Sequence, residues 1–314
     1  MATYIDLRCD FGFKFCMQDE TVMKSFLNAI LEGETDKITS VKFKNVEVPH
    51  PGKNQRGVTF DLLCTTNRGE TILIEMQNAP QRYFKTRAAF YVSTILLNQF
   101  RRGFKWEEMK QDISRIFGIF IMGESNEWLN KAITRTSEYD RDELVEFWDR
   151  IHNFFLSLPH FKLDKGNITP KDIWLYFFKD LGTMDRIDPS VYERADEGLL
   201  KLLEKAKVAA LTKEEYYQYE ASMKALEDEI DMEKHGYRRG MEDGVKQGIQ
   251  QGIQQGIQQG IQQGIQQGIQ QGVQQGIQQT LEETVKLLYQ SGMPAKEISE
   301  RLKMPEDKIN SIIG

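Results

Sequence analysis

Two acidic residues lie in segments that are otherwise apolar. Asp61 and Glu75 occur in the β-branched stretches 57–66 and 70–77, which the turn sequence at 67–69 separates. This pattern predicts a β-hairpin. Two carboxylates facing each other across a hairpin repel, and strand stability does not explain them. A divalent cation bound by both carboxylates explains their placement.

The length of the turn decides whether the two carboxylates meet. If residues 67–69 form a three-residue loop with Gly69 in a left-handed conformation, Asp61 lies directly opposite Glu75. A two-residue loop would place Asp61 on the other face of the sheet. Gln77 shares the face of Glu75, because side chains alternate along a strand.

This arrangement predicts hydrolytic chemistry at a metal ion. Mg²⁺ is typically bound by one or two carboxylates and completes its octahedron with water and phosphate oxygens, and Mn²⁺ or another divalent cation would use the same oxygen ligands. A bound cation activates water and neutralises charge on a phosphoryl oxygen. We therefore expect Asp61 and Glu75 to be metal ligands and catalytic residues, and Gln77 to position the water.

A basic segment follows the hairpin. Residues 81–103 are predicted to form a helix, and no acidic residue occurs between 80 and 105. Basic side chains interleaved with aromatic ones suit contacts to a DNA backbone. The alternative is a solvated helix face beside a core stripe. The residues expected to contact nucleic acid are Arg82, Lys85, Arg87 and Tyr91.

The elements around the hairpin predict a mixed α/β fold. Apolar spacing indicates a helix over 21–32, β-branched residues indicate strands over 41–48 and 113–122, and the order is helix, three strands, helix, strand. We expect a mixed α/β core over 1–125 with a central sheet. A mixed strand and helix extension, mainly helical, is expected over 126–235.

A glycine occupies every fourth position from Gly236 to Gly276, mostly in the repeat Gly-Ile-Gln-Gln. Eleven glycines cost a helix on the order of 11 kcal/mol relative to alanine, which argues against an isolated helix. Two interpretations of the low-complexity segment 236–280 remain: a spacer of variable length, or a helix that forms homo-oligomers through close backbone contact.

The last segment, 281–314, is predicted to form three short helices that resemble a helix-turn-helix unit. It holds five basic and six acidic residues, whereas a helix that reads duplex DNA usually presents several basic side chains. A small helical packing unit is therefore favoured over a DNA-reading one.

Composition excludes several classes of protein. The chain has 314 residues, of which 40% are hydrophobic and 28% charged, as in a folded globular protein. Its three cysteines predict free thiols and a cytoplasmic protein. Neither a signal peptide nor a membrane span is expected. The four histidines lack zinc-site spacing, and no phosphate-binding loop occurs.

Several ordered motifs resemble one known family, the recombination-promoting nuclease and transposase group of the PD-(D/E)XK nuclease superfamily. The similarity extends from Asp10 to about Met122. The motifs that carry it are Asp10-Phe-Gly-Phe-Lys14-Phe, Phe26-Leu-Asn28-Ala-Ile-Leu31, Phe60-Asp61, Ile74-Glu75-Met-Gln77, and Arg87 with Tyr91.

The resemblance implies a restriction-endonuclease-like core and Mg²⁺-dependent cleavage of DNA, with Asp61 and Glu75 as metal ligands. Gln77 stands where the wider superfamily has a lysine, and Asp10 and Lys14 are accessory candidates. The expected function is a DNA endonuclease associated with recombination or mobile elements. The alternative is a non-catalytic DNA-binding or regulatory oligomer assembled through the repeat.

Overall fold

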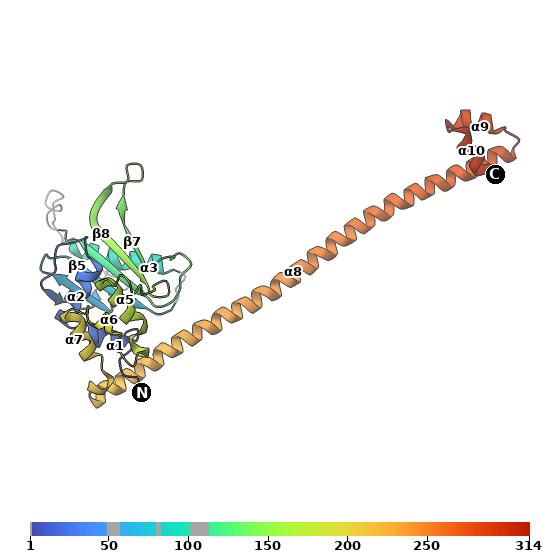
Figure 1. The fold of residues 1–314 in the computed structure, drawn as a ribbon. Helices are drawn as coiled ribbons and strands as arrows, with labels where there is room; N and C mark the ends of the chain where they lie inside the picture. Colours follow the sequence, from blue (N-terminus) through green and yellow to red (C-terminus); the bar gives the residue numbers. More distant parts are fainter. Residues whose placement is uncertain (1, 49–56, 80–82, 101–112) are drawn as a thin grey trace. The chain divides into compact units, whose positions relative to one another are not determined.

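The structure is a computed structural model that describes residues 2–48, 57–79, 83–100 and 113–314 (Figure 1). The chain divides into two compact units, Met1–Gly236 and Tyr237–Gly314. Helix α8 (Lys213–Gln290) contributes residues to both units. Each unit is described by itself.

A six-stranded mixed sheet forms the centre of the first unit. Its strand order is β1-β4-β5-β6-β8-β7, with β5, β6 and β8 parallel and the other neighbours antiparallel. A separate pair is made by two short strands, β2 and β3. The strands are β1 (Val41–Phe43), β2 (Glu47–Val48), β3 (Val58–Thr59), β4 (Leu62–Thr66), β5 (Thr71–Gln77), β6 (Ile116–Met122), β7 (Ile133–Tyr139) and β8 (Glu146–Ser157).

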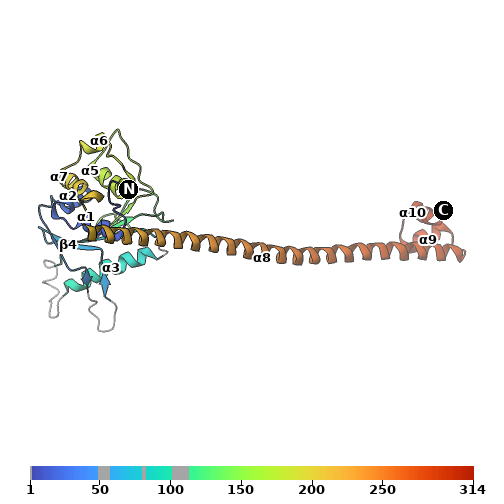
Figure 2. The same cartoon turned by 90° about the horizontal axis from the view of Figure 1, so that it is seen from below.

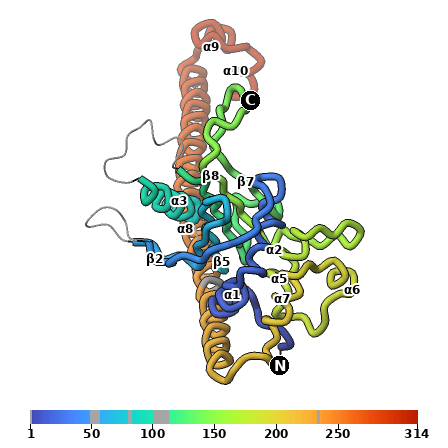
Figure 3. The backbone as a smooth tube through the Cα atoms, turned by 90° about the vertical axis from the view of Figure 1, so that its left-hand side faces the viewer, coloured from blue at the N-terminus to red at the C-terminus, as the bar shows by residue number. Residues whose placement is uncertain are grey.

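Helices cover both faces of this sheet (Figures 2 and 3). Alternate strand residues such as Ile72 and Ile74 join a large core with the helices on one face, and Leu73 joins a smaller core with α3 on the other. The large core is built with α1 (Asp10–Met17), α2 (Glu20–Ile30), α5 (Pro170–Asp180), α6 (Pro189–Tyr192) and α7 (Glu197–Lys205), and the smaller one with α3 (Phe84–Gln99).

The first predicted helix is confirmed, and a second one precedes it. Helix α2 begins after Asp19, whose side chain accepts hydrogen bonds from the N–H groups of the first turn, and Gly33 follows its end with a φ of +82°. Helix α1 was not predicted. It is only eight residues long and is capped by the thiol of Cys9, a residue type that is not a recognised helix-start signal.

The predicted strands and long helix are shorter than expected. The stretch 57–66 is not one strand, because the chain bends at Phe60 and Asp61 between β3 and β4. The stretch 41–48 is likewise divided into β1 and β2. The predicted helix over 81–103 is represented by α3, and residues 101–112 lie outside the described part of the chain.

Residues beyond 125 complete the sheet of the predicted core. Strand β8 pairs with β6 in parallel, from Ile116 opposite Ile151 to Met122 opposite Ser157. Helices α5 and α7 pack on α2 in the same core. The sequence placed 1–125 and 126–235 in separate segments, whereas the structure holds both in one compact unit, because the pairing of β8 with β6 crosses that boundary.

The second unit contains the repeat and the terminal helices. Residues 237–280 are helical within α8, and their isoleucine and valine side chains are more than half exposed. Helices α9 (Ala295–Leu302) and α10 (Glu306–Ile313) pack on the end of α8 around three buried residues, Val285, Ile298 and Ile309. In the described ranges, no helix combines the length and the apolar character needed to cross a membrane.

The packing of α7 on α2 gives a test of the single compact unit. A Cβ atom at Gly198 would lie 2.3 Å from Ser25 Cβ and 2.7 Å from the Thr21 carbonyl oxygen. We expect Gly198→Ala to lower the free energy of unfolding by roughly 2–3 kcal/mol, measured by urea denaturation. The control is Gly166→Ala in an exposed loop, for which we expect a change within about 0.5 kcal/mol. Equal effects would contradict this packing.

Candidate active site

The hairpin has the register that the three-residue loop predicts. Leu62 lies opposite Ile74, and Gly69 has a φ of +81°. Continued by one residue, this register places Asp61 opposite Glu75. The turn therefore brings the two acidic residues together.

Two hydrogen bonds connect these residues. The Asp61 N–H donates to Glu75 Oε1 at 2.9 Å, and the Met76 N–H donates to Asp61 Oδ2 at 2.8 Å. Because a strand N–H points along the plane of the sheet, the Asp61 carboxylate lies beside β5 at the point where β4 leaves it. Asp61 therefore takes the position of a backbone partner of Met76, next to the carboxylate of Glu75.

The environment of Glu75 disfavours its negative charge. Its side chain is buried, and burial, followed by the charge of Asp61, raises the pKa of Glu75 to about 8. The hydrogen bond from Asp61 and the positive charges of Arg87 and Lys14 act in the opposite direction. A further positive charge at this position, such as a bound cation, would favour the ionised form of Glu75.

Charged side chains of helix α1 affect the pKa of Asp61. Burial and the charge of Asp10 raise the pKa of Asp61, while the hydrogen bond from Met76 and the charges of Lys14 and Arg87 lower it. Lys14 Nζ lies 2.6 Å from Asp10 Oδ1, one helical turn away. The structure thus places both accessory candidates of α1 within electrostatic reach of Asp61.

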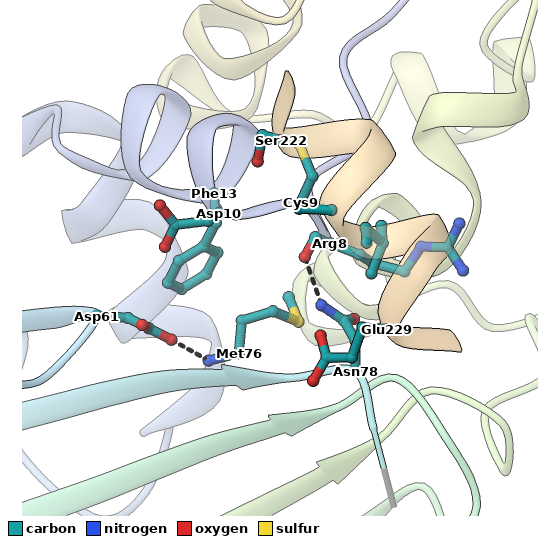
Figure 4. Close-up of a pocket in the computed structure, with 11 residues that line it drawn as sticks. Arg8, Cys9, Asp10, Phe13, Asp61, Met76, Asn78, Ser222 and Glu229 are labelled. Carbon is teal, nitrogen blue, oxygen red and sulfur yellow. Dashed lines mark hydrogen bonds between the residues drawn. The ribbon is translucent and has the colours of Figure 1, made fainter. Parts of the chain in front are cut away.

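A cavity of about 210 Å³ opens beside Asp61. Figure 4 shows Asp10 and Asp61 at one end of it and Glu229, from the first part of α8, at the other. Asn78 and Arg8 also line it, and the Asn78 side chain donates to the Arg8 carbonyl oxygen at 2.6 Å. The cavity gives small molecules such as water access to the Asp61 side of the site.

The sequence did not predict that α8 forms a wall of this cavity. Ser222 Oγ accepts a hydrogen bond from the Phe11 N–H at 3.0 Å and fixes α8 on α1. The available signal was the helical spacing of apolar residues near the end of the extension 126–235, which was predicted only to be mainly helical. These residues are Tyr219, Met223, Leu226 and Ile230, all of which join the large core.

Arg87 of α3 contacts the site from the side of Gln77 and Tyr91. Its Nη1 donates to Gln77 Oε1 at 3.2 Å, its Nε donates to the Tyr91 hydroxyl at 2.6 Å, and its Nη2 lies 3.9 Å from Glu75 Oε2. Gln77 also donates from Nε2 to the Ala79 carbonyl oxygen at 2.9 Å. Two residues expected to contact DNA, Arg87 and Tyr91, therefore lie against the residues expected to perform catalysis.

Of the other two residues predicted to contact DNA, only Lys85 is described. Lys85 is exposed on α3, with its Nζ 4.9 Å from the centre of the Trp128 ring. Arg82 lies outside the described residues.

Comparison with known families gives a match over most of the chain. The model of the PD-(D/E)XK nuclease family transposases matches residues 7–235. The chain belongs to this family. Neither a curated protein nor a solved structure matches it. The matched range corresponds closely to the first compact unit, Met1–Gly236, and contains every residue of the site.

The donor set formed by Asp61 and Glu75 fits a hard divalent cation. Asp61 Oδ1 and Glu75 Oε2 remain after the two hydrogen bonds are made, and carboxylate oxygens are the ligands that Mg²⁺ prefers. The described residues contain no cluster of three or more His, Cys, Asp or Glu side chains that could hold a metal. Two carboxylates are sufficient for Mg²⁺, which keeps several waters in its coordination sphere.

The raised pKa of Glu75 predicts a pH-dependent stability. A folded-state pKa above the unfolded value means that the folded protein binds more protons between about pH 4.5 and 8, so stability falls as the pH rises through that range. We expect the metal-free protein to lose at least about 4 °C in Tm relative to Glu75→Gln between pH 5 and 8, measured by calorimetry.

Added Mg²⁺ provides the second half of this measurement. At pH 8 it should raise the Tm of the wild-type protein and leave that of Glu75→Gln nearly unchanged, because ligand binding to the folded state alone is stabilising. Parallel pH profiles for the two proteins, with no response to Mg²⁺, would contradict the charge assigned to Glu75.

Proposed function

We propose that the chain is a Mg²⁺-dependent endodeoxyribonuclease that hydrolyses phosphodiester bonds in DNA, in the context of recombination or element mobility. The observation that carries this proposal is the reciprocal hydrogen bonding that holds Asp61 and Glu75 together at the end of the hairpin. Membership of a nuclease family supports the same chemistry.

Each residue has a distinct role in this proposal. Asp61 and Glu75 hold the cation, which when bound activates water and neutralises charge on the phosphoryl oxygen. Gln77, with its side chain fixed by two hydrogen bonds, positions the attacking water. Lys85, together with Arg82, contacts backbone phosphates without reading sequence.

Helix α1 completes the electrostatics of the site. Lys14 places a positive charge near both carboxylates, and Asp10 restrains Lys14 through the ion pair. In this proposal both act as accessory residues that adjust the charge of the site and do not bind the cation.

Plasmid nicking tests the proposed activity. We expect the wild-type protein to convert supercoiled DNA to open circles in Mg²⁺ and not in EDTA. Asp61→Asn and Glu75→Gln should each reduce the rate by roughly 100-fold or more, since metal binding contributes several kcal/mol to such a reaction. Both variants keep a side-chain oxygen that can accept the observed backbone hydrogen bond.

A matched control comes from the same hairpin. Glu70 is also a buried acidic residue, but its carboxylate accepts hydrogen bonds from Thr35 and Thr66 at the turn end of the hairpin. Glu70→Gln should retain a rate within about threefold of wild type. Undiminished cleavage by Asp61→Asn or Glu75→Gln would exclude the proposed metal ligands.

We further propose that residues 236–280 assemble copies of the chain, the basis of a regulatory or DNA-binding oligomer. A Cβ atom at any repeat glycine meets nothing within 4 Å, and the isoleucine side chains are exposed, so no described contact offsets the helical cost of eleven glycines. Packing of a second helix against these small and apolar residues would offset it.

Paired charge substitutions test this assembly. Ile257→Lys with Ile261→Lys should lower the mass measured by light scattering, because lysine replaces the apolar contact. Gln258→Lys with Gln262→Lys adds the same charge to the same helix turns and should leave the mass unchanged. A monomeric wild-type chain, or equal effects of the two pairs, would argue against the proposal.

A further inference from the structure

Arg87 contacts three residues at the site, while its side chain is 38% exposed. Three nitrogen atoms of its guanidinium point to three different partners: Nη1 to Gln77, Nε to Tyr91, and Nη2 toward Glu75. A guanidinium that grips a phosphate usually presents two parallel N–H groups to it. Here the nitrogens are directed at Gln77 and Glu75 of β5 and at Tyr91 of the same helix.

Tyr91 anchors Arg87 from the next turn of the same helix. The Tyr91 side chain is buried, and its ring makes an edge contact with the ring of Phe60, at 5.3 Å between centroids and an angle of 84°. Phe60 is itself buried and directly precedes Asp61. The Arg87 guanidinium also lies over the Tyr91 ring, with Cζ 5.1 Å from its centre. Arg87 is therefore held by the part of the core that leads into the metal site.

Arg87 also determines the orientation of the Gln77 amide. Arginine can only donate hydrogen bonds and a carbonyl oxygen can only accept them. Gln77 must therefore turn Oε1 toward Arg87 and Nε2 toward the Ala79 carbonyl, as observed. Without the guanidinium, one of these two restraints is lost and the amide can rotate.

We propose that Arg87, anchored by Tyr91, is a positioning residue that orients Gln77 and the Glu75 carboxylate for the reaction and does not grip DNA. This inference rests on the proposed nuclease function and assigns to Arg87 and Tyr91 a role different from the DNA contact that the sequence suggested. Lys85, exposed two residues earlier on the same helix, keeps the phosphate-binding role.

Two glutamine substitutions on α3 separate positioning from DNA binding. Arg87→Gln and Lys85→Gln each remove one positive charge. We expect Arg87→Gln to lower kcat at saturating DNA by at least about tenfold, because small displacements of reacting groups are costly. Its Kd for a fluorescent duplex, measured by anisotropy in EDTA, should stay within about twofold of wild type. Lys85→Gln should raise that Kd by roughly threefold, because it removes a phosphate contact.

Two further variants separate orientation from charge and from folding. Tyr91→Phe keeps the charge of Arg87 and removes only the hydroxyl that anchors it, so kcat should fall while the Kd in EDTA stays the same. Arg87→Lys keeps the charge without the planar fork and should not restore kcat. Circular dichroism of each variant verifies that the fold is retained.

The results discriminate between the two roles. A rise in Kd for Arg87→Gln equal to that for Lys85→Gln overturns the proposal, and so does an unchanged kcat in both Arg87→Gln and Tyr91→Phe. If the wild-type protein does not cleave DNA in Mg²⁺, the nuclease function fails separately. The anisotropy comparison in EDTA then still determines whether Arg87 contacts DNA.

Discussion

The structure of the site depends on how the antiparallel pairing of β4 and β5 ends. At that point a backbone N–H of each strand needs an acceptor. The Glu75 carboxylate accepts from the Asp61 N–H, and the Asp61 carboxylate accepts from the Met76 N–H. The exchange of hydrogen bonds fixes two acidic side chains at the end of a buried strand. It also leaves each with one oxygen for another ligand, at a position where burial makes an uncompensated negative charge unfavourable.

Positive charge reaches this pair from two separate helices. Lys14 approaches from α1 and Arg87 from α3, so the carboxylates lie between elements on the two faces of the sheet. Neither charge removes the effect of burial on Glu75. A divalent cation bound by both carboxylates would relieve this imbalance.

The residues of the site belong to the first unit, and the second unit has a core of its own. The first unit includes the start of α8, where Ser222 fixes the helix on α1 beside the cavity. The second unit has its own small core around Ile298. Among the described residues, nothing lies within 4 Å of a Cβ position at a repeat glycine.

Local rules in the sequence were sufficient for the hairpin. Three turn residues ending in a glycine define the register, and the register alone brings Asp61 opposite Glu75. The helical spacing of apolar residues over 21–32 likewise indicated α2. These features could be predicted because they depend on residues close together in the chain.

Tertiary structure decided the remaining contacts. The turn of the Asp61 carboxylate into the plane of the sheet, the pairing of β8 with β6, the wall supplied by α8 and the engagement of Arg87 with Gln77 all join residues from separate elements. Periodicity assigns each element its own buried face but does not determine which elements meet. Strand order and helix packing determine that, through contacts formed between distant parts of the chain.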